Sequence, residues 1–158
     1  MEMRLRKYKP SDFDTVSKLF YDTIHAVNGK DYTQEQCNAW TAKSDCLKKK
    51  RGALKKQHTV LAEQDGMIVG FGSVDDTGCL DLLYVHKDYQ KQGIATALCK
   101  ELEKDFTVMK THASLTAKPF FEACGYVAIQ AQEVDCLGIK LKNYVMEKHR
   151  SITDCQDI

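Results

Sequence analysis

This sequence lacks an excess of positive or negative charge. Its 158 residues include 23 lysines and arginines against 22 aspartates and glutamates, a formal net charge of +1. That balance gives no overall indication of nucleic-acid binding. No apolar run reaches the roughly 18 to 20 residues that a membrane helix needs, and the opening MEMRLRKYKP lacks the apolar stretch of a secretion signal. We therefore expect a cytoplasmic protein that binds neither membrane nor nucleic acid.

Closely spaced cysteines are also lacking, although the chain has seven cysteines. Their number is odd, and no two stand at a CxxC or another short zinc-binding spacing. The chain is long enough to bury a core without disulfide staples. We expect reduced thiols and no metal, because a metal site would require distant cysteines and histidines to converge. The seven are Cys37, Cys46, Cys79, Cys99, Cys124, Cys136 and Cys155.

Helix and strand patterns fill nearly the whole chain. Pro10 ends a first alternating segment, and Ser11 or Asp12 is placed to cap the helix that follows. Thr33 and Gln36 form a weak capping box for a second helix. Strands are predicted over residues 3–8, 58–64, 67–75, 79–86, 106–113, 126–135 and 138–147. Helices are predicted over residues 11–27, 33–40, 44–57 and 93–104 and within 116–126.

The order of these elements predicts a mixed α/β domain around one mostly antiparallel sheet. Asp65-Gly66 is a strong hairpin turn, and residues 79–86 are apolar enough to form a central strand. The strands before and after the helix at 93–104 are expected to pair in parallel, joined by that helix. We expect residues 1–150 to form a single domain and residues 151–158 to form a frayed tail.

A basic run, KKKR at residues 48–51, stands out within 44–57. It resembles a nuclear import signal or a nucleic-acid patch. The alternative is a solvated helix face with Leu47 and Leu54 directed inward, and the balanced net charge favours this alternative.

The two common phosphate-binding patterns, GxxxxGK[ST] and GxGxxG, are absent. Gly93 nevertheless stands where a charged loop becomes an amphipathic helix. A helix start leaves N–H groups unpaired and favours negative charge, and glycine lets a ligand approach the backbone closely. This is a candidate phosphate cradle, with ordinary turn chemistry as the alternative. Further donors come from Gln90, Lys91, Gln92 and Thr96.

The stretch LLYVHKDYQKQGIATALCKELE, residues 82–103, resembles the coenzyme A motif of the GNAT superfamily of N-acetyltransferases. That motif reads [QR]-x-x-G-x-[GA], which here is Gln90, Gly93 and Ala95. The order of elements over residues 3–148 also resembles the GNAT fold. YTQEQCNAW and TAKPFFEACGY are similar to stretches of the bacterial YafP-type branch.

The resemblance implies an enzyme that transfers an acetyl group from acetyl-CoA to a primary amine of a small molecule or peptide, by direct attack in a ternary complex. It implies a GNAT fold with a central splayed pair of parallel strands, flanked by helices. The Val85 N–H would be the oxyanion donor. The cofactor would be bound by Leu83, Tyr84, Val85, Gln90, Lys91, Gln92, Gly93, Ile94, Ala95, Thr96, Ser114 and Phe121.

Asp81 is an acid within the apolar strand CLDLLYV. Strand alternation predicts that it shares one face with Cys79, Leu83 and Val85, and relatives with a base on this strand have it at position 79 or 81. Burial would raise the pKa of Asp81 towards a useful range. We predict that Asp81 lies near the acceptor amine, as its base or as a partner of its ammonium group. The alternatives are a structural acid near the strand end, or one paired with a surface lysine, with a water chain taking the proton.

Phe121 stands where the family's general acid is often a tyrosine, and it has no proton to give. Possible replacements are Tyr126, Cys124 and Tyr144. Ser114 stands where many relatives have an asparagine that contacts the pantetheine arm, although it is equally placed to cap the next helix.

The acceptor pocket of this family usually lies under the first two helices. Tyr32 and Trp40 bracket the second helix here, and an aromatic wall beside Asp81 would suit a cation or a flat amine. Core packing is an equal alternative for Trp40, and no histidine is assigned a role. A non-catalytic acyl-CoA-binding regulator, another acyl donor or an O-acceptor are the competing functions. The acceptor, and the choice between monomer and homodimer, are left open.

Overall fold

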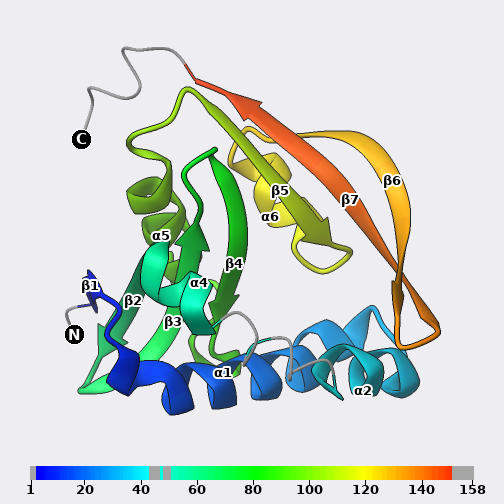
Figure 1. Ribbon diagram of the computed structural model, residues 1–158, viewed down its shortest axis with the longest axis horizontal. Coiled ribbons are helices and arrows are strands. Elements are labelled where there is room, and N and C mark those ends of the chain that lie inside the picture. Colours follow the sequence, from blue (N-terminus) through cyan, green and yellow to red (C-terminus); the bar gives the residue numbers. More distant parts are fainter. Residues whose placement is uncertain (1–2, 43–46, 48–50, 151–158) are drawn as a thin grey trace.

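The computed structural model describes residues 3–42, 47 and 51–150, and their strands form one seven-stranded sheet (Figure 1). The strand order is β1-β2-β3-β4-β5-β7-β6. All neighbours are antiparallel except β4 and β5, which are parallel. The predicted α/β sheet, mostly antiparallel with a central parallel pair, is confirmed. The strands are β1 (Met3–Lys7), β2 (His58–Gln64), β3 (Met67–Val74), β4 (Cys79–Val85), β5 (Val108–Ser114), β6 (Val127–Cys136) and β7 (Ile139–His149).

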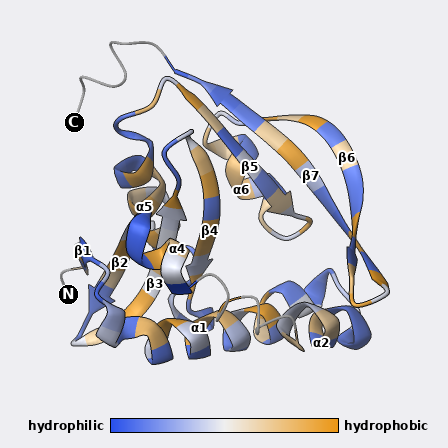
Figure 2. Cartoon of the chain, viewed as in Figure 1, coloured by the Kyte–Doolittle hydropathy of each residue, from blue (hydrophilic) through white to orange (hydrophobic). Residues whose placement is uncertain are grey.

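Helices pack on both faces of the sheet. The buried residues of α1, α2 and α4 form one hydrophobic cluster against the sheet, and those of α5 and α6 belong to a second cluster on the other face. The central strand β4 is mostly hydrophobic, as expected for a strand covered on both faces (Figure 2). The helices are α1 (Phe13–Ala26), α2 (Gln34–Ala42), α4 (Arg51–Lys56), α5 (Ile94–Glu103) and α6 (Lys118–Ala123), with 3-10 turns η1 (Pro10–Asp12), η2 (Asn28–Lys30) and η3 (Lys87–Tyr89).

The capping box predicted for α2 is present. Thr33 Oγ1 accepts the Gln36 N–H at 3.1 Å, and Gln36 Oε1 accepts the Thr33 N–H at 2.9 Å. Two donors of the first turn are thereby satisfied by side chains. This cap fixes where α2 begins and therefore where Tyr32, just before it, and Trp40, within it, are held.

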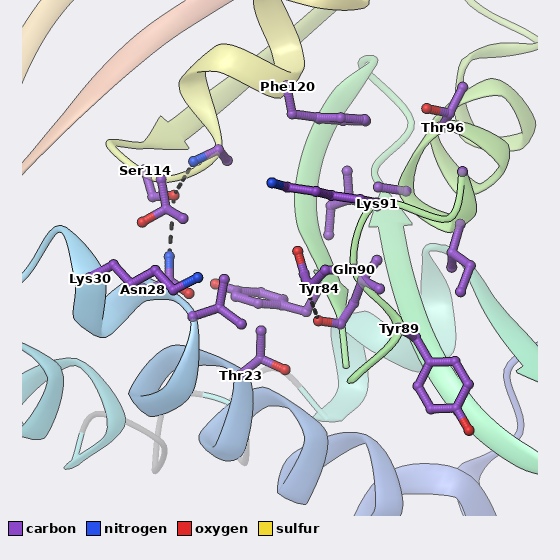
Figure 3. Close-up of a pocket in the computed structure, with 18 residues that line it drawn as sticks. Thr23, Asn28, Lys30, Tyr84, Tyr89, Gln90, Lys91, Thr96, Ser114 and Phe120 are labelled. Atoms are coloured by element: carbon purple, nitrogen blue, oxygen red, sulfur yellow. Dashed lines mark hydrogen bonds between the residues drawn. The ribbon is translucent and has the colours of Figure 1, made fainter. Parts of the chain in front are cut away.

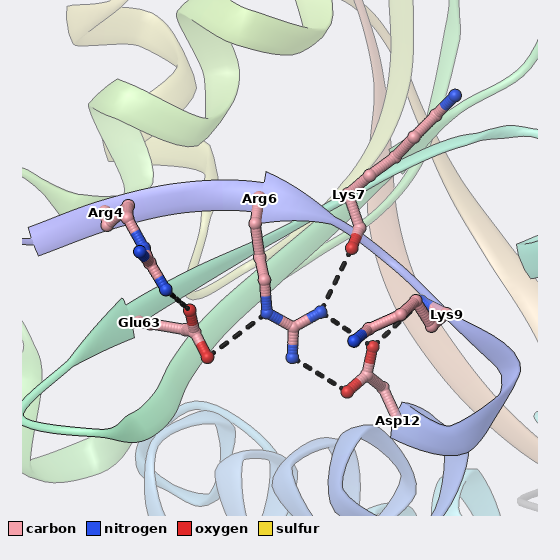
Figure 4. Close-up of polar contacts among 6 residues, drawn as sticks. All are labelled: Arg4, Arg6, Lys7, Lys9, Asp12 and Glu63. Carbon is pink, nitrogen blue, oxygen red and sulfur yellow. Dashed lines mark hydrogen bonds and ion pairs between the residues drawn. The ribbon is translucent and has the colours of Figure 1, made fainter.

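Asp12 does not cap α1 in the way that we predicted. Its carboxylate makes no bond to the first turn of α1 and instead accepts the Lys9 N–H and two N–H groups of Arg6 at 2.8–2.9 Å (Figure 4). The Arg6 guanidinium lowers the pKa of this buried carboxyl. Its contribution to stability is therefore present above the unfolded-state pKa of about 3.9 and is lost as pH falls through the folded-state pKa.

Several local predictions are confirmed around the second and third strands. Asp65 and Gly66 form the β2–β3 turn with φ of 57° and 77°, and Leu47 and Leu54 are both 1% exposed. The basic run falls on residues 48–50, outside the described residues, apart from Arg51. The predicted tail also lies outside them. None of the helices in the described part of the chain is long and apolar enough to span a membrane.

A β-bulge interrupts β4 at Asp81. The register of β3 against β4 shifts between Ser73 and Val74, which pair with Leu82 and Leu80. Asp81 is therefore an extra residue with no position opposite it, and the side-chain alternation of the strand is offset by one at this point.

Candidate functional site

The parallel strands β4 and β5 separate soon after they meet. They pair only at Cys79↔Lys110 and Leu80↔Thr111, with one additional bond from Thr111 Oγ1 to the Leu80 carbonyl at 3.0 Å. Beyond this point the strands diverge towards their C-terminal ends (Figure 1). The predicted splay is thus present, and two cavities lie along it, of about 390 and 460 Å³.

The first cavity, which we call the loop cavity, is bordered by the segment between β4 and α5. All the predicted cofactor residues line it except Gln92 and Phe121. Its lining residues are Thr23, Val27, Asn28, Lys30, Leu83, Tyr84, Val85, Tyr89, Gln90, Lys91, Gly93, Ile94, Ala95, Thr96, Ser114, Thr116, Ala117 and Phe120.

The start of α5 presents free backbone donors to the loop cavity. Gly93 is the N-cap with φ +84°, and Lys91 also has positive φ, +59°. The first helical bond runs from the Ala97 N–H to the Gly93 carbonyl, so the N–H groups of residues 94–96 have no partner within the helix. A Cβ at Gly93 would meet no protein atom within 4 Å. The backbone here is open to a ligand, and the Lys91 side chain extends into the same space (Figure 3).

The backbone of Val85 also faces the splay. The His86 N–H donates to the Val69 carbonyl on β3, so Val85, one residue earlier, directs its N–H and carbonyl away from β3. Its carbonyl accepts the Gln90 side-chain amide at 2.6 Å. By the same alternation, the N–H and carbonyl of Leu83 point away from β3, towards the space between β4 and β5. The missing β4–β5 pairing thus leaves the Val85 N–H and the peptide groups of Leu83 without a partner strand, whereas the Val85 carbonyl is bonded to Gln90.

Orphaned hydroxyl groups occur on the other walls of the loop cavity. Thr23 Oγ1 and Thr116 Oγ1 are buried and have no hydrogen-bond partner. Ser114 Oγ accepts the N–H of Ala117, the residue before α6, and the side-chain amide of Asn28 (Figure 3). The N-cap residue of α6 is Ala117, and no side chain caps this helix. Ser114 therefore bonds to the residue at the helix start without being its cap, and it lines both cavities.

Phe121 does not reach the loop cavity, and this corrects our expectation for it. Its ring is 3% exposed and packs edge-on against Phe120 and Tyr126. Phe120 lines the cavity instead, because it follows Ala117 by one helical turn and shares its face. Tyr126, like Cys124 and Tyr144, lines neither cavity. None of the proposed replacements for a tyrosine acid is therefore at the splay.

The second cavity, which we call the aromatic cavity, lies between the first two helices and the sheet. It brings together the three predicted acceptor residues, Tyr32, Trp40 and Asp81. Tyr84 and Ser114 line both cavities, so the two meet at these residues. The complete lining is Phe20, Tyr32, Trp40, Leu47, Asp81, Leu82, Tyr84, His112, Ser114, Val134, Asp135, Cys136, Leu141, Lys142 and Asn143.

The aromatic walls are held by ring contacts and by a buried phenol. Tyr32 and Trp40 meet edge-to-face at 5.4 Å, as do Phe20 and Tyr84 at 5.1 Å. The Tyr32 hydroxyl donates to the Lys142 carbonyl at 2.6 Å and accepts the Leu115 N–H at 2.9 Å. Burial raises the pKa of Tyr32. The neutral Tyr32 phenol makes two hydrogen bonds and thus links the start of α2 to β7 and to the segment after β5.

Asp81 faces the aromatic cavity because of the bulge. Leu82 and Tyr84 pack in the cluster on the α1 side of the sheet, whereas Leu83 and Val85 pack in the cluster on the α5 side. Asp81 lines the cavity together with the first pair. The prediction that it shares a face with Leu83 and Val85 was wrong, because strict alternation does not hold across a bulge.

Other lining residues were not found from the sequence. His112 follows Thr111 on β5, just beyond the last pair of β4 and β5, and it lines the aromatic cavity together with Asp81. Asn143 Oδ1 is buried and has no hydrogen-bond partner. No local pattern marks these residues, because each comes from a different strand. Burial raises the pKa of the Tyr84 phenol, and the nearby Asp81 adds to this effect.

The comparison with known protein families shows which proteins this chain resembles. The family model described as an acetyltransferase (GNAT) domain matches residues 28–148. The chain belongs to the GNAT family. It is 31% identical over 144 residues to a protein of Escherichia coli K12 described as the uncharacterized N-acetyltransferase YafP, over 91% of this chain and 94% of that protein. The predicted likeness to the YafP branch is confirmed, and this GNAT protein is an acetyltransferase.

Solved structures agree with this assignment. A GCN5-related N-acetyltransferase from Rhodopseudomonas palustris is 34% identical with a TM-score of 0.88, over 94% of this chain and 98% of that chain. The PaiA N-acetyltransferase of Thermoplasma acidophilum, solved with coenzyme A, is 17% identical with a TM-score of 0.73, over 94% and 99% of the two chains. YncA of Salmonella typhimurium, solved with acetyl-CoA, is 16% identical with a TM-score of 0.63, over 96% and 95%. The last two likenesses concern the fold alone.

Proposed function

We propose that this GNAT protein binds acetyl-CoA in the loop cavity and transfers the acetyl group to a primary amine held in the aromatic cavity. The transfer is a direct attack in a ternary complex. The observation that carries this proposal is the junction of the two cavities at Tyr84 and Ser114 within the β4–β5 splay. A donor entering from one side and an acceptor entering from the other meet there.

The loop cavity fits the chemical groups of acetyl-CoA. Unpaired amides at the start of α5 and the side chains of Lys30 and Lys91 suit a pyrophosphate. Gly93 leaves the backbone approachable. The unpartnered hydroxyls of Thr23 and Thr116 are further available partners. In this proposal the amides of residues 91–96 hold the pyrophosphate, and the peptide groups of Leu83 pair with the pantetheine arm.

Acetyl-CoA supplies a thioester whose carbonyl must be polarised. The Val85 N–H, which faces the splay, is the proposed donor to that carbonyl oxygen. A fixed backbone donor aimed at developing charge typically contributes roughly 3 kcal/mol to lowering the barrier. Because no tyrosine stands at position 121, the proposal assigns no side chain of α6 as the acid for the departing thiolate.

Asp81 is the proposed partner of the acceptor amine. It either binds the ammonium group or takes its proton, and His112 lines the same cavity. The surrounding rings of Trp40, Tyr32 and Phe20 favour a cationic acceptor, since a cation is attracted to aromatic faces. A water between Asp81 and the amine is compatible with either role.

The deciding experiment measures acetylated product by mass spectrometry with acetyl-CoA and a panel of aryl, alkyl and peptidyl amines. Product with at least one primary amine supports the proposal. Binding of acetyl-CoA with no product from any amine would favour an acyl-CoA-binding regulator. Product only from hydroxyl acceptors, or only with longer acyl donors, would replace the amine or the acetyl group in the proposal.

A further inference from the structure

One tyrosine stands where the two cavities meet. Tyr84 is the next-to-last residue of β4 and lines both the loop cavity and the aromatic cavity. Ser114, the other shared residue, uses its hydroxyl within the protein, in bonds with Ala117 and Asn28. Among the residues that the structure describes, the Tyr84 hydroxyl has no hydrogen-bond partner. Tyr84 thus brings an unused polar group to the junction.

The ring that carries this hydroxyl is held in place. It stacks on Phe71, which stands directly opposite on β3, with ring centroids 5.7 Å apart. It also meets Phe20 of α1 edge-to-face at 5.1 Å. Both arrangements are favourable for aromatic pairs. The hydroxyl points into the cavity, towards the side on which Asn28 and Ser114 lie (Figure 3). A fixed ring therefore presents an unbonded O–H group at a defined place.

The surroundings keep Tyr84 protonated. Burial raises the pKa of its phenol, and the negative charge of Asp81 raises this pKa further. The ordinary pKa of a phenol is already about 10, so the hydroxyl is a hydrogen-bond donor at neutral pH. It is also a weak acid, which can donate a hydrogen bond to a developing negative charge without giving up its proton.

We propose that the Tyr84 hydroxyl is a catalytic group that donates a hydrogen bond to the reacting thioester of acetyl-CoA and stabilises the negative charge that develops there. This inference rests on the function proposed above, because it requires the thioester to lie at the junction of the cavities. Val85, whose N–H is the proposed oxyanion donor, is the next residue of β4. A backbone donor and a side-chain donor would thus serve the same group, where Phe121 offers no hydroxyl.

The negative charge passes over two atoms during the transfer. The amine nitrogen attacks the acetyl carbon, and an electron pair of the C=O bond moves to oxygen. That pair then re-forms the C=O bond while the C–S bond breaks, and the bonding electrons leave on sulfur as a thiolate. The proton of the amine goes to Asp81 or to water, and Tyr84 keeps its own proton throughout. A fixed donor aimed at such charge is needed at oxygen first and at sulfur afterwards.

The test uses Tyr84→Phe, which keeps the ring and its contacts with Phe20 and Phe71 and removes only the hydroxyl. We expect kcat to fall roughly 100-fold, with little change in the acceptor KM and in the affinity for acetyl-CoA. Tyr144→Phe is the matched control, because Tyr144 lines neither cavity. It should leave kcat and acetyl-CoA binding unchanged.

Two further measurements require no acceptor. Infrared difference spectroscopy of bound acetyl-CoA, isotope-labelled at the acetyl carbonyl, reports a hydrogen bond to oxygen as a lower C=O stretching frequency, which Tyr84→Phe should raise. The ultraviolet absorption of the thiolate, followed through a pH titration, gives the pKa of the thiol of bound coenzyme A. A bond from Tyr84 to sulfur holds this pKa down, so Tyr84→Phe should raise it by roughly 1 to 2. A lower kcat together with a change in either measurement supports the proposal and identifies the atom that Tyr84 contacts.

Several results would overturn the proposal. An unchanged kcat in Tyr84→Phe removes the catalytic role, and a raised acceptor KM with unchanged kcat would assign the hydroxyl to acceptor binding. A lower kcat with both acceptor-free measurements unchanged would assign it to positioning the amine. If the wild type binds no acetyl-CoA, the proposed function fails together with this inference. If acetyl-CoA binds normally and Tyr84→Phe behaves like the wild type, this inference alone fails.

Discussion

The two cavities along the splay differ in whether backbone groups or side chains form most of their walls. More than half of the residues that line the loop cavity come from one segment, between Leu83 and Thr96, which includes the free amides at the start of α5. The aromatic cavity relies on side chains from α1, α2, β4, β5, β6 and β7. A site made of backbone tolerates many side chains as long as its conformation is kept. A site made of side chains changes with each substitution, so under the proposed function the aromatic cavity is where the choice of acceptor would be set.

Asp81→Asn is expected to give the largest difference between an effect on the aromatic cavity and an effect on the loop cavity. This change keeps the shape of the side chain and removes its charge, so turnover should fall by roughly 100- to 10,000-fold if Asp81 is the base. Acetyl-CoA affinity should be unchanged, because Asp81 does not line the loop cavity. The measurements are kcat, the acceptor KM and acetyl-CoA binding by calorimetry, with the pH profile of kcat/KM for both forms.

Asp135→Asn is the matched control, because Asp135 also lines the aromatic cavity but its side chain is 57% exposed in an ion pair with Lys140. It should change turnover far less. A raised acceptor KM with unchanged kcat in Asp81→Asn would assign a binding role to Asp81. If wild type and Asp81→Asn have the same kcat and the same acidic limb in the pH profile of kcat/KM, Asp81 has a structural role only.

Neighbouring phenylalanines should separate stability from cofactor binding. Phe121→Ala removes a ring that is 3% exposed and should lower the free energy of unfolding by about 3–5 kcal/mol. Phe120→Ala removes a wall of the loop cavity and should weaken acetyl-CoA binding with a smaller loss of stability. Urea denaturation and calorimetry measure the two effects. Equal stability losses together with unchanged acetyl-CoA affinity in Phe120→Ala would contradict the assignment of Phe120 to the cofactor wall.

Gly93→Val tests the backbone character of the loop cavity. The valine side chain would occupy the space from which a phosphate approaches the amides, and it would strain a residue with φ of +84°. Losing one charge-assisted bond, about 1.5–3 kcal/mol, should raise the Kd of acetyl-CoA roughly 10- to 100-fold. Gly138→Val is a close control, because Gly138 has the same φ and equally open space in the β6–β7 turn. If both variants bind acetyl-CoA like the wild type, the loop assignment is wrong.

The smallest effect is expected from Trp40→Leu in the aromatic cavity. Leucine keeps an apolar residue but removes the ring face, and a lost cation–π contact of about 0.5–1 kcal/mol should raise the KM of a cationic acceptor roughly 2- to 5-fold. Trp40→Phe should retain most of the affinity. The same change should leave acetyl-CoA binding unaltered. An unchanged KM with Trp40→Leu would assign Trp40 to the core alone.

Features that depend on short segments could be predicted from the sequence. The element order, the central place of β4, the turn at Asp65-Gly66 and the capping box at Thr33 each rest on a few neighbouring residues, and the structure confirms them. The loop before α5 is of the same kind, since turn residues and the helix start are adjacent in the chain.

Features that depend on register or on distant partners could not be predicted. The bulge at Asp81 arises from how β3 pairs with β4, and nothing in CLDLLYV marks it. Ser11 or Asp12 was expected to cap α1. Asp12 is the N-cap residue, but its carboxylate bonds to Arg6 on β1 and makes no cap bond. Phe120 and Phe121 are adjacent in sequence, and only the packing of α6 on the sheet decides which ring is buried.

The two-pair junction between β4 and β5 also has a mechanical consequence. The sheet therefore has two halves, β1–β4 and β5–β7, which are joined only by the short β4–β5 pairing. The Lys110 N–H donates a hydrogen bond to the Gly78 carbonyl at this junction. Local opening is easiest where the fewest bonds must break together, so amide exchange at Lys110 should report how often the two halves part. A ligand that contacts both halves of the sheet would hold them together. Amide exchange at Lys110 should then become slower, even though the ligand does not contact Lys110 itself.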